Sequence, residues 1–112
     1  MAWVPIESGT TVGQAGSENG VVLRDEEHEL GARITLERDT VNAPFAITCG
    51  IYGWMFHTRY FGGEIEAVEA FERMKDSLGA ILGTIPSVDD PHVDVKSRQV
   101  CEAISSFVER FP

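Results

Sequence analysis

The residues best suited to chemistry are Cys49 and His57, which lie in an apolar and aromatic stretch, residues 47–63. A histidine within hydrogen-bonding reach can activate a cysteine as a nucleophile. However, Cys49 sits in the run FAITCGI, and such apolar surroundings favour an inert, buried thiol. We therefore predict no catalytic residue. Cys49 and Cys101 show no C-x-x-C spacing, and we expect both to be free, buried thiols in a reducing compartment.

His57 and Arg59 are two residues apart in the same predicted strand, so they share one side of it, and Thr58 between them points to the other side. Together with Tyr60 or Tyr52 they could bind a small anion or carboxylate, because the arginine fork suits bidentate contacts. In a pocket at the sheet for a small molecule, His57 and Arg59 would be joined by Tyr52 and Trp54. We favour a simpler interpretation, in which both residues lie at the solvated end of the strand and pair with an acid, either Glu37, Glu64 or Glu66. A small-molecule-binding domain or minor enzyme with a pocket around His57 and Arg59 is kept as the alternative function.

Two further patterns could suggest bound groups. The run DEEHE, residues 25–29, contains oxygen and imidazole ligands suited to Mn or Zn, but adjacent residues rarely converge on one ion, and we predict a solvated hairpin tip. The glycines at 13, 16 and 20 follow no buried strand and open no helix, which a phosphate-binding loop requires. We predict neither a metal site nor a cofactor.

Composition restricts the class of protein. The chain has 112 residues, enough for a single domain spanning 1–112, and 43% of them are hydrophobic. Its 18 acidic and 9 basic residues give a net charge of −9, which disfavours nucleic acid and anionic membranes. The N-terminal segment lacks the basic and long apolar regions of a signal peptide, so we expect a cytoplasmic protein.

The elements follow from periodicity. Residues 3–6 are expected to form a short edge strand. Apolar and polar residues alternate in residues 21–25 and 32–38, which predicts two strands paired as a hairpin. Residues 45–61 are too long for one straight strand; we favour a hairpin of 44–50 with 53–61, and a single bent strand stays open. Helical spacing then predicts a helix from residue 64 that Pro86 stops, and a second one with Asp90 as its cap and Pro91 at its first position. The expected fold is α+β: an antiparallel meander of four or five strands with two C-terminal helices packed on one face.

The aromatic stretch motivates the functional prediction. Two helices can cover only one face of a small sheet, yet residues 51–61 have large apolar side chains on both sides. Either Trp3 folds across the second face, or another chain covers it. We predict a non-enzymatic, homodimeric interaction or regulatory domain, with a basic protein as a further partner suggested by the charge. The residues expected at the interface or at a ligand site are Tyr52, Trp54, Phe56, His57, Arg59 and Tyr60.

Overall fold

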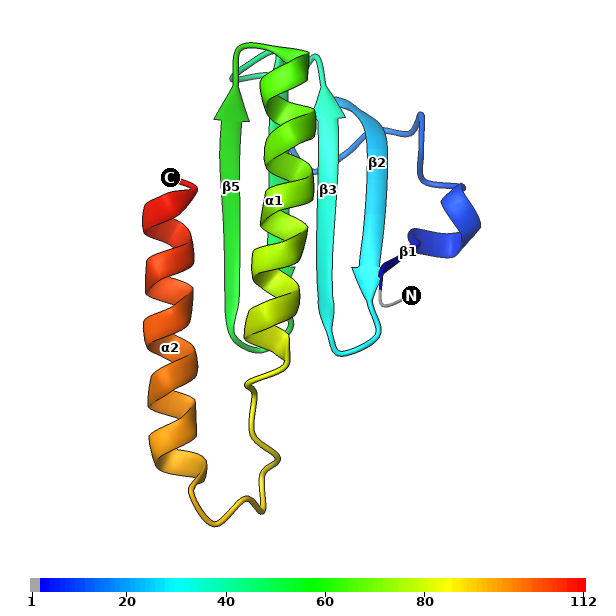
Figure 1. The fold of residues 1–112 in the computed structure, drawn as a ribbon. Coiled ribbons are helices and arrows are strands. Elements are labelled where there is room, and N and C mark those ends of the chain that lie inside the picture. The colour runs from blue at the N-terminus through cyan, green and yellow to red at the C-terminus, as the bar shows by residue number, and fades with distance from the viewer. Residues whose placement is uncertain (1–2) are drawn as a thin grey trace.

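A computed structural model describes residues 3–112. Five strands form one antiparallel sheet in which each strand pairs with the next along the chain. They are β1 (Trp3–Pro5), β2 (Val21–His28), β3 (Ala32–Arg38), β4 (Phe45–Ile51) and β5 (Met55–Phe61). Two helices follow, α1 (Glu64–Leu82) and α2 (Val93–Arg110), and a short 3-10 turn, η1 (Ile6–Gly9), comes after β1. The predicted α+β meander with two C-terminal helices is confirmed (Figure 1).

Helix α1 lies across one face of the sheet, which we call the helix face (Figure 1). Its buried stripe contains Phe71, Met74 and Leu78, all without exposed surface. The strands present their alternate apolar residues to this stripe: Ile34 and Leu36 from β3, and Ile47, Cys49 and Ile51 from β4. Burying each such side chain contributes about 1.5–3 kcal/mol, so this layer contains the main core.

Helix α2 lies beside β5 at the edge of the sheet and extends beyond it (Figure 1). Its buried residues are Val100 and Phe107, and Phe111, which follows the helix, is also buried. The Phe107 ring meets the His57 ring edge-on, with their centroids 6.4 Å apart. Cys101 is not among the buried residues of α2 and is exposed. The prediction that both cysteines are buried is therefore wrong for Cys101.

Residues 45–61 form the hairpin that the sequence favoured, with strands β4 and β5 joined by a turn at residues 52–54. Gly53 has a φ of 83°, a left-handed conformation that glycine adopts readily. Trp3, by contrast, lies in β1 and stacks edge-on against His28 of β2, with ring centroids 5.1 Å apart. Trp3 is thus at the opposite edge from β5 and does not cover its aromatic residues.

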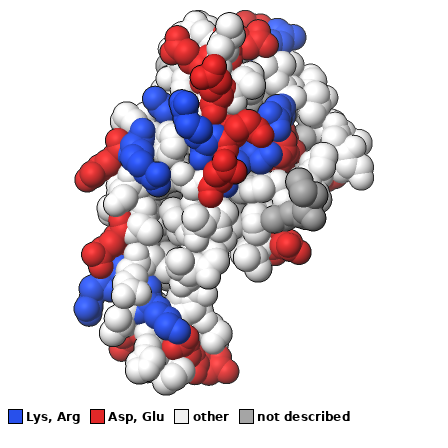
Figure 2. All heavy atoms as spheres, in the orientation of Figure 1, with Lys and Arg blue, Asp and Glu red and all other residues white. Residues whose placement is uncertain are grey.

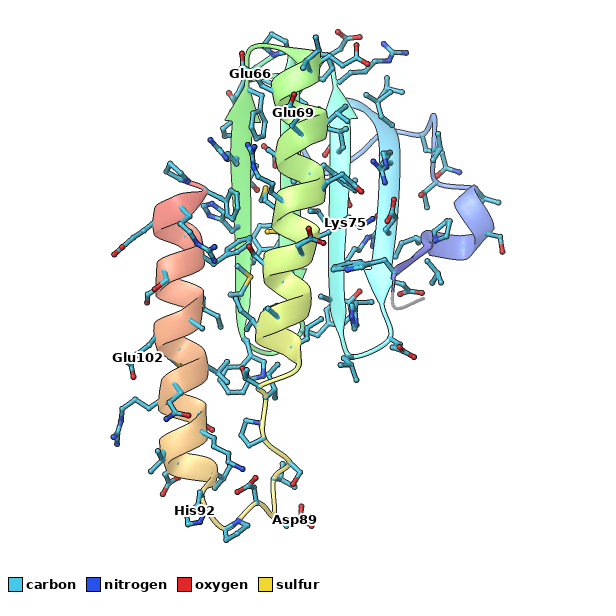
Figure 3. The ribbon with its side chains drawn as sticks, viewed as in Figure 1. Glu66, Glu69, Lys75, Asp89, His92 and Glu102 are labelled. Atoms are coloured by element: carbon cyan, nitrogen blue, oxygen red, sulfur yellow. The ribbon has the colours of Figure 1, made fainter. Side chains whose placement is uncertain are left out.

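The acidic run 25–29 is not a solvated hairpin tip, because β2 continues through His28. Strand alternation sends Glu26 and His28 to the helix face and Asp25 and Glu27 to the other. On the helix face, Lys75 reaches from α1 toward β2 and contacts Glu26 at 2.6 Å (Figure 3). Acidic and basic side chains are interleaved over this part of the surface (Figure 2).

Candidate functional site

The side of the sheet opposite α1 is called the open face; it carries Asp25, Thr35, Thr48 and Phe56. The loop formed by residues 10–20 crosses part of it. At one end of this loop, the Gly13 N–H donates to the Val22 carbonyl at 2.8 Å. The loop is therefore fixed over part of the open face.

Glu37 and Tyr60 hold the other end of the loop. The buried Glu37 carboxylate accepts hydrogen bonds from the Glu18 and Gly20 backbone N–H groups, at 3.2 and 3.1 Å. The Tyr60 hydroxyl donates to the Glu18 carboxylate at 2.5 Å. A β-carbon on Gly16 would lie 2.3 Å from Cδ of Glu37, so this glycine is explained by close packing over a buried carboxylate.

A cavity of about 520 Å³ lies between this loop and the β4–β5 turn, and we call it the open-face cavity. One wall comes from Thr11 and residues 14–17 of the loop, and another from Tyr52 and Phe56. The strands contribute Asp25, Arg33, Thr35 and Thr48. The cavity thus combines hydroxyl and charged groups from the sheet with an aromatic rim from the hairpin.

Asp25 and Arg33 form a fixed ion pair in this cavity. Nε and Nη2 of Arg33 donate to the two carboxylate oxygens at 2.9 and 2.6 Å, and the Thr35 hydroxyl donates to Oδ1 at 2.9 Å. Burial by itself raises the pKa of Asp25, but the hydrogen bonds from Arg33 and Thr35 outweigh it and hold that pKa below its usual value. Asp25 is 3% exposed, whereas 46% of the Arg33 side chain faces solvent.

Three of the six residues predicted at an interface or ligand site are exposed together. Tyr52, Phe56 and Tyr60 are 59, 75 and 44% exposed, and Phe56 and Tyr60 are alternate residues on the open side of β5. We call these three residues the aromatic corner. Trp54 lies in the same turn, but it is half-buried and packs against the core.

The other two predicted residues lie on the helix face under α2. His57 Nε2 is hydrogen-bonded to the Phe111 carbonyl, and the Arg59 guanidinium lies 4.8 Å from the Phe61 ring centroid. The sheet therefore separates His57 and Arg59 from the open-face cavity, whose lining contains neither of them. Glu37, one of the acids proposed to pair with them, is on the open face.

Cys49 and His57 are directly opposite each other in the pairing of β4 with β5. Burial raises the pKa of the Cys49 thiol to about 12, which leaves almost no thiolate near neutral pH. The predicted inert thiol agrees with this environment. Within residues 3–112, no group of three or more His, Cys, Asp or Glu side chains is arranged to hold a metal ion.

Sequence reasoning missed the Asp25–Arg33 pair, because its formation depends on where the β2–β3 hairpin turns. A turn at residues 29–31 makes the two residues diagonal neighbours, and a shift by one residue would place them on opposite faces. Comparisons with protein-family models, curated proteins and solved structures found no match to this chain. In the part of the chain that the structure describes, neither helix is long and apolar enough to cross a membrane.

Proposed function

We propose that this protein is a non-enzymatic, homodimeric interaction domain and that the aromatic corner is the centre of the contact between two copies. The observation that carries the proposal is the exposure of Tyr52, Phe56 and Tyr60 on one side of the edge strand β5. Tyrosine and phenylalanine are enriched at the centres of protein interfaces, where acidic side chains are depleted.

Charge favours a second copy as the occupant. Two chains that each carry a net charge of −9 repel each other over most of their surfaces. Residues 41–63 contain no acidic residue, and the aromatic corner lies within them. A two-fold contact through this corner therefore brings together the segments of two acidic molecules that contain no acid, with Glu18 held at the margin by the Tyr60 hydroxyl. Closed dimers of this kind are the commonest soluble assemblies.

The contact must extend beyond the corner. A stable interface buries roughly 800 Å² on each partner, more than three partly exposed side chains supply. The adjacent open face is the surface that would extend it, because α2 lies beside the outer edge of β5. The acidic remainder of the molecule would then stay outside the dimer, where it could attract a basic protein partner.

Sedimentation velocity over a concentration series tests the dimer, with Phe56→Asp as the disrupting variant. Ile65→Asp is the matched control, because Ile65 on α1 is 76% exposed and Phe56 is 75% exposed. We expect the wild-type chain and Ile65→Asp to be dimers at tens of micromolar, and Phe56→Asp to be a folded monomer. A monomeric wild-type chain under those conditions contradicts the proposal, and so does a Phe56→Asp variant that remains dimeric.

A further inference from the structure

The open-face cavity has the size and lining of a small-molecule site. Its volume of about 520 Å³ falls in the range of roughly 300–1,000 Å³ that is typical of ligand pockets. Such pockets combine apolar walls with a few well-placed polar groups. Here Tyr52 and Phe56 supply the apolar wall, while Arg33, Thr35 and Thr48 supply the polar groups.

Arg33 is a donor whose orientation is already fixed. Two of its nitrogens, Nε and Nη2, bind the buried Asp25 carboxylate at 2.9 and 2.6 Å. The Nη1 edge of the guanidinium is not used in this pair, and almost half of the side chain is exposed. Because the long side chain is held by its inner edge, a ligand oxygen would bind the outer edge without ordering the arginine first.

The charge around this donor is net negative, because two acids, Asp25 and Glu27, lie against one base, Arg33. Asp25 neutralises Arg33 directly, and Glu27 lies opposite Arg33 in the pairing of β2 with β3. The Glu27 carboxylate acts on the same guanidinium. A negatively charged ligand would meet this acid pair as well as the arginine, and a positively charged one would meet the outer donor edge. An uncharged acceptor, such as an amide carbonyl, avoids both costs.

We propose that the open-face cavity binds a small uncharged molecule in which a flat aromatic ring carries a carbonyl-type oxygen. The oxygen accepts hydrogen bonds from the outer edge of Arg33, and the ring packs against Phe56 and Tyr52. This inference goes beyond the proposed dimer and does not depend on it. Arg33 belongs to the cavity alone and Tyr60 to the aromatic corner alone, whereas Phe56 and Tyr52 contribute to both.

Benzamide is the probe, and benzoate and benzylamine are its charged analogues. Each is titrated into the full chain while ¹H–¹⁵N spectra follow the Arg33 Nε–H and the backbone amides of Thr35 and Thr48. We expect benzamide to shift these three signals with a millimolar dissociation constant, because so small a ligand makes few contacts. Benzoate and benzylamine should bind at least about threefold more weakly.

Two variants complete the test. Phe56→Ala should weaken benzamide binding about fivefold through loss of the aromatic contact, and Ile65→Ala, a change at an equally exposed position, should leave it unchanged. The inference is overturned if benzamide leaves the three signals in place, if a charged analogue binds as tightly, or if Phe56→Ala binds like the wild-type chain. Each titration is also run on Tyr60→Ala, which removes a residue of the aromatic corner and leaves every cavity-lining residue in place, so a failed dimer experiment and a failed titration are distinguishable.

Discussion

Asp25 and Arg33 are diagonal neighbours across the β2–β3 hairpin, joined by two parallel hydrogen bonds of 2.9 and 2.6 Å. The carboxylate is buried and the guanidinium is half exposed, so the pair connects the interior of the open face to solvent. Bidentate pairs of this kind fix the geometry of both side chains. Here they give the cavity a donor of defined orientation.

The Asp25 pair predicts a specific loss of stability in acid. The pKa of Asp25 in the folded chain lies below the value of 3.8 expected for an unperturbed aspartate. As the pH falls, the unfolded chain therefore takes up this proton first, and the stabilisation that is present above about pH 4 is lost as the pH falls through the folded pKa. Urea unfolding between about pH 5 and pH 2 should show a steeper loss in the wild-type chain than in Asp25→Asn. Parallel curves would show that Asp25 contributes nothing.

The two cysteines should differ sharply in reactivity. Cys101 is exposed, whereas Cys49 is buried with a pKa raised to about 12. A thiol reagent at mildly alkaline pH should modify one cysteine of the native wild-type chain and none in Cys101→Ser, since the thiolate is the reactive form. In denaturant, Cys101→Ser should react fully. Rapid modification of native Cys101→Ser would mean that Cys49 is activated after all.

Substitution by aspartate should lower the free energy of unfolding much more at Trp54 than at Phe56. Trp54 packs against the core, so Trp54→Asp buries a charge without a partner and should lower the free energy of unfolding by about 2 kcal/mol or more. Phe56 is mostly exposed, and Phe56→Asp should cost less than about 1 kcal/mol. Denaturant unfolding of both variants, in the concentration range where the chain is monomeric, gives the comparison. Equal losses would contradict the assignment of Trp54 to the core.

Gly16 should tolerate no side chain. A β-carbon there would lie 2.3 Å from the Glu37 side chain, which is buried and held by two backbone N–H groups and so cannot easily move away. We expect Gly16→Ala to lower the free energy of unfolding by about 1–3 kcal/mol. Gly62→Ala is the control, because a β-carbon at Gly62 would meet no atom within 4 Å. Thermal or urea unfolding measures both, and equal stabilities would show that the loop can lift from Glu37 at little cost.

Periodicity was sufficient for the fold. The alternation of residues 32–38 and the helical spacing of Phe71, Met74 and Leu78 each mark one buried side, and that requirement is local. The same reasoning identified the hairpin within residues 45–61, because a compact domain of this length has no room for so long a straight strand. It also identified a sheet with more apolar surface than its helices cover, and Tyr52, Phe56 and Tyr60 are indeed exposed.

Tertiary structure decided which of these residues lie together. Strand alternation alone does not say which face of the sheet the helices pack on. In the structure, α2 lies beside β5 and, with Phe111, covers His57 and Arg59. The predicted set was thereby divided between two faces. The ion pair of Asp25 with Arg33 and the loop fastened over Glu37 depend on hairpin register and on contacts between residues distant in sequence. Such contacts are settled only when the whole chain packs, because each is one of many pairings that the local sequence allows.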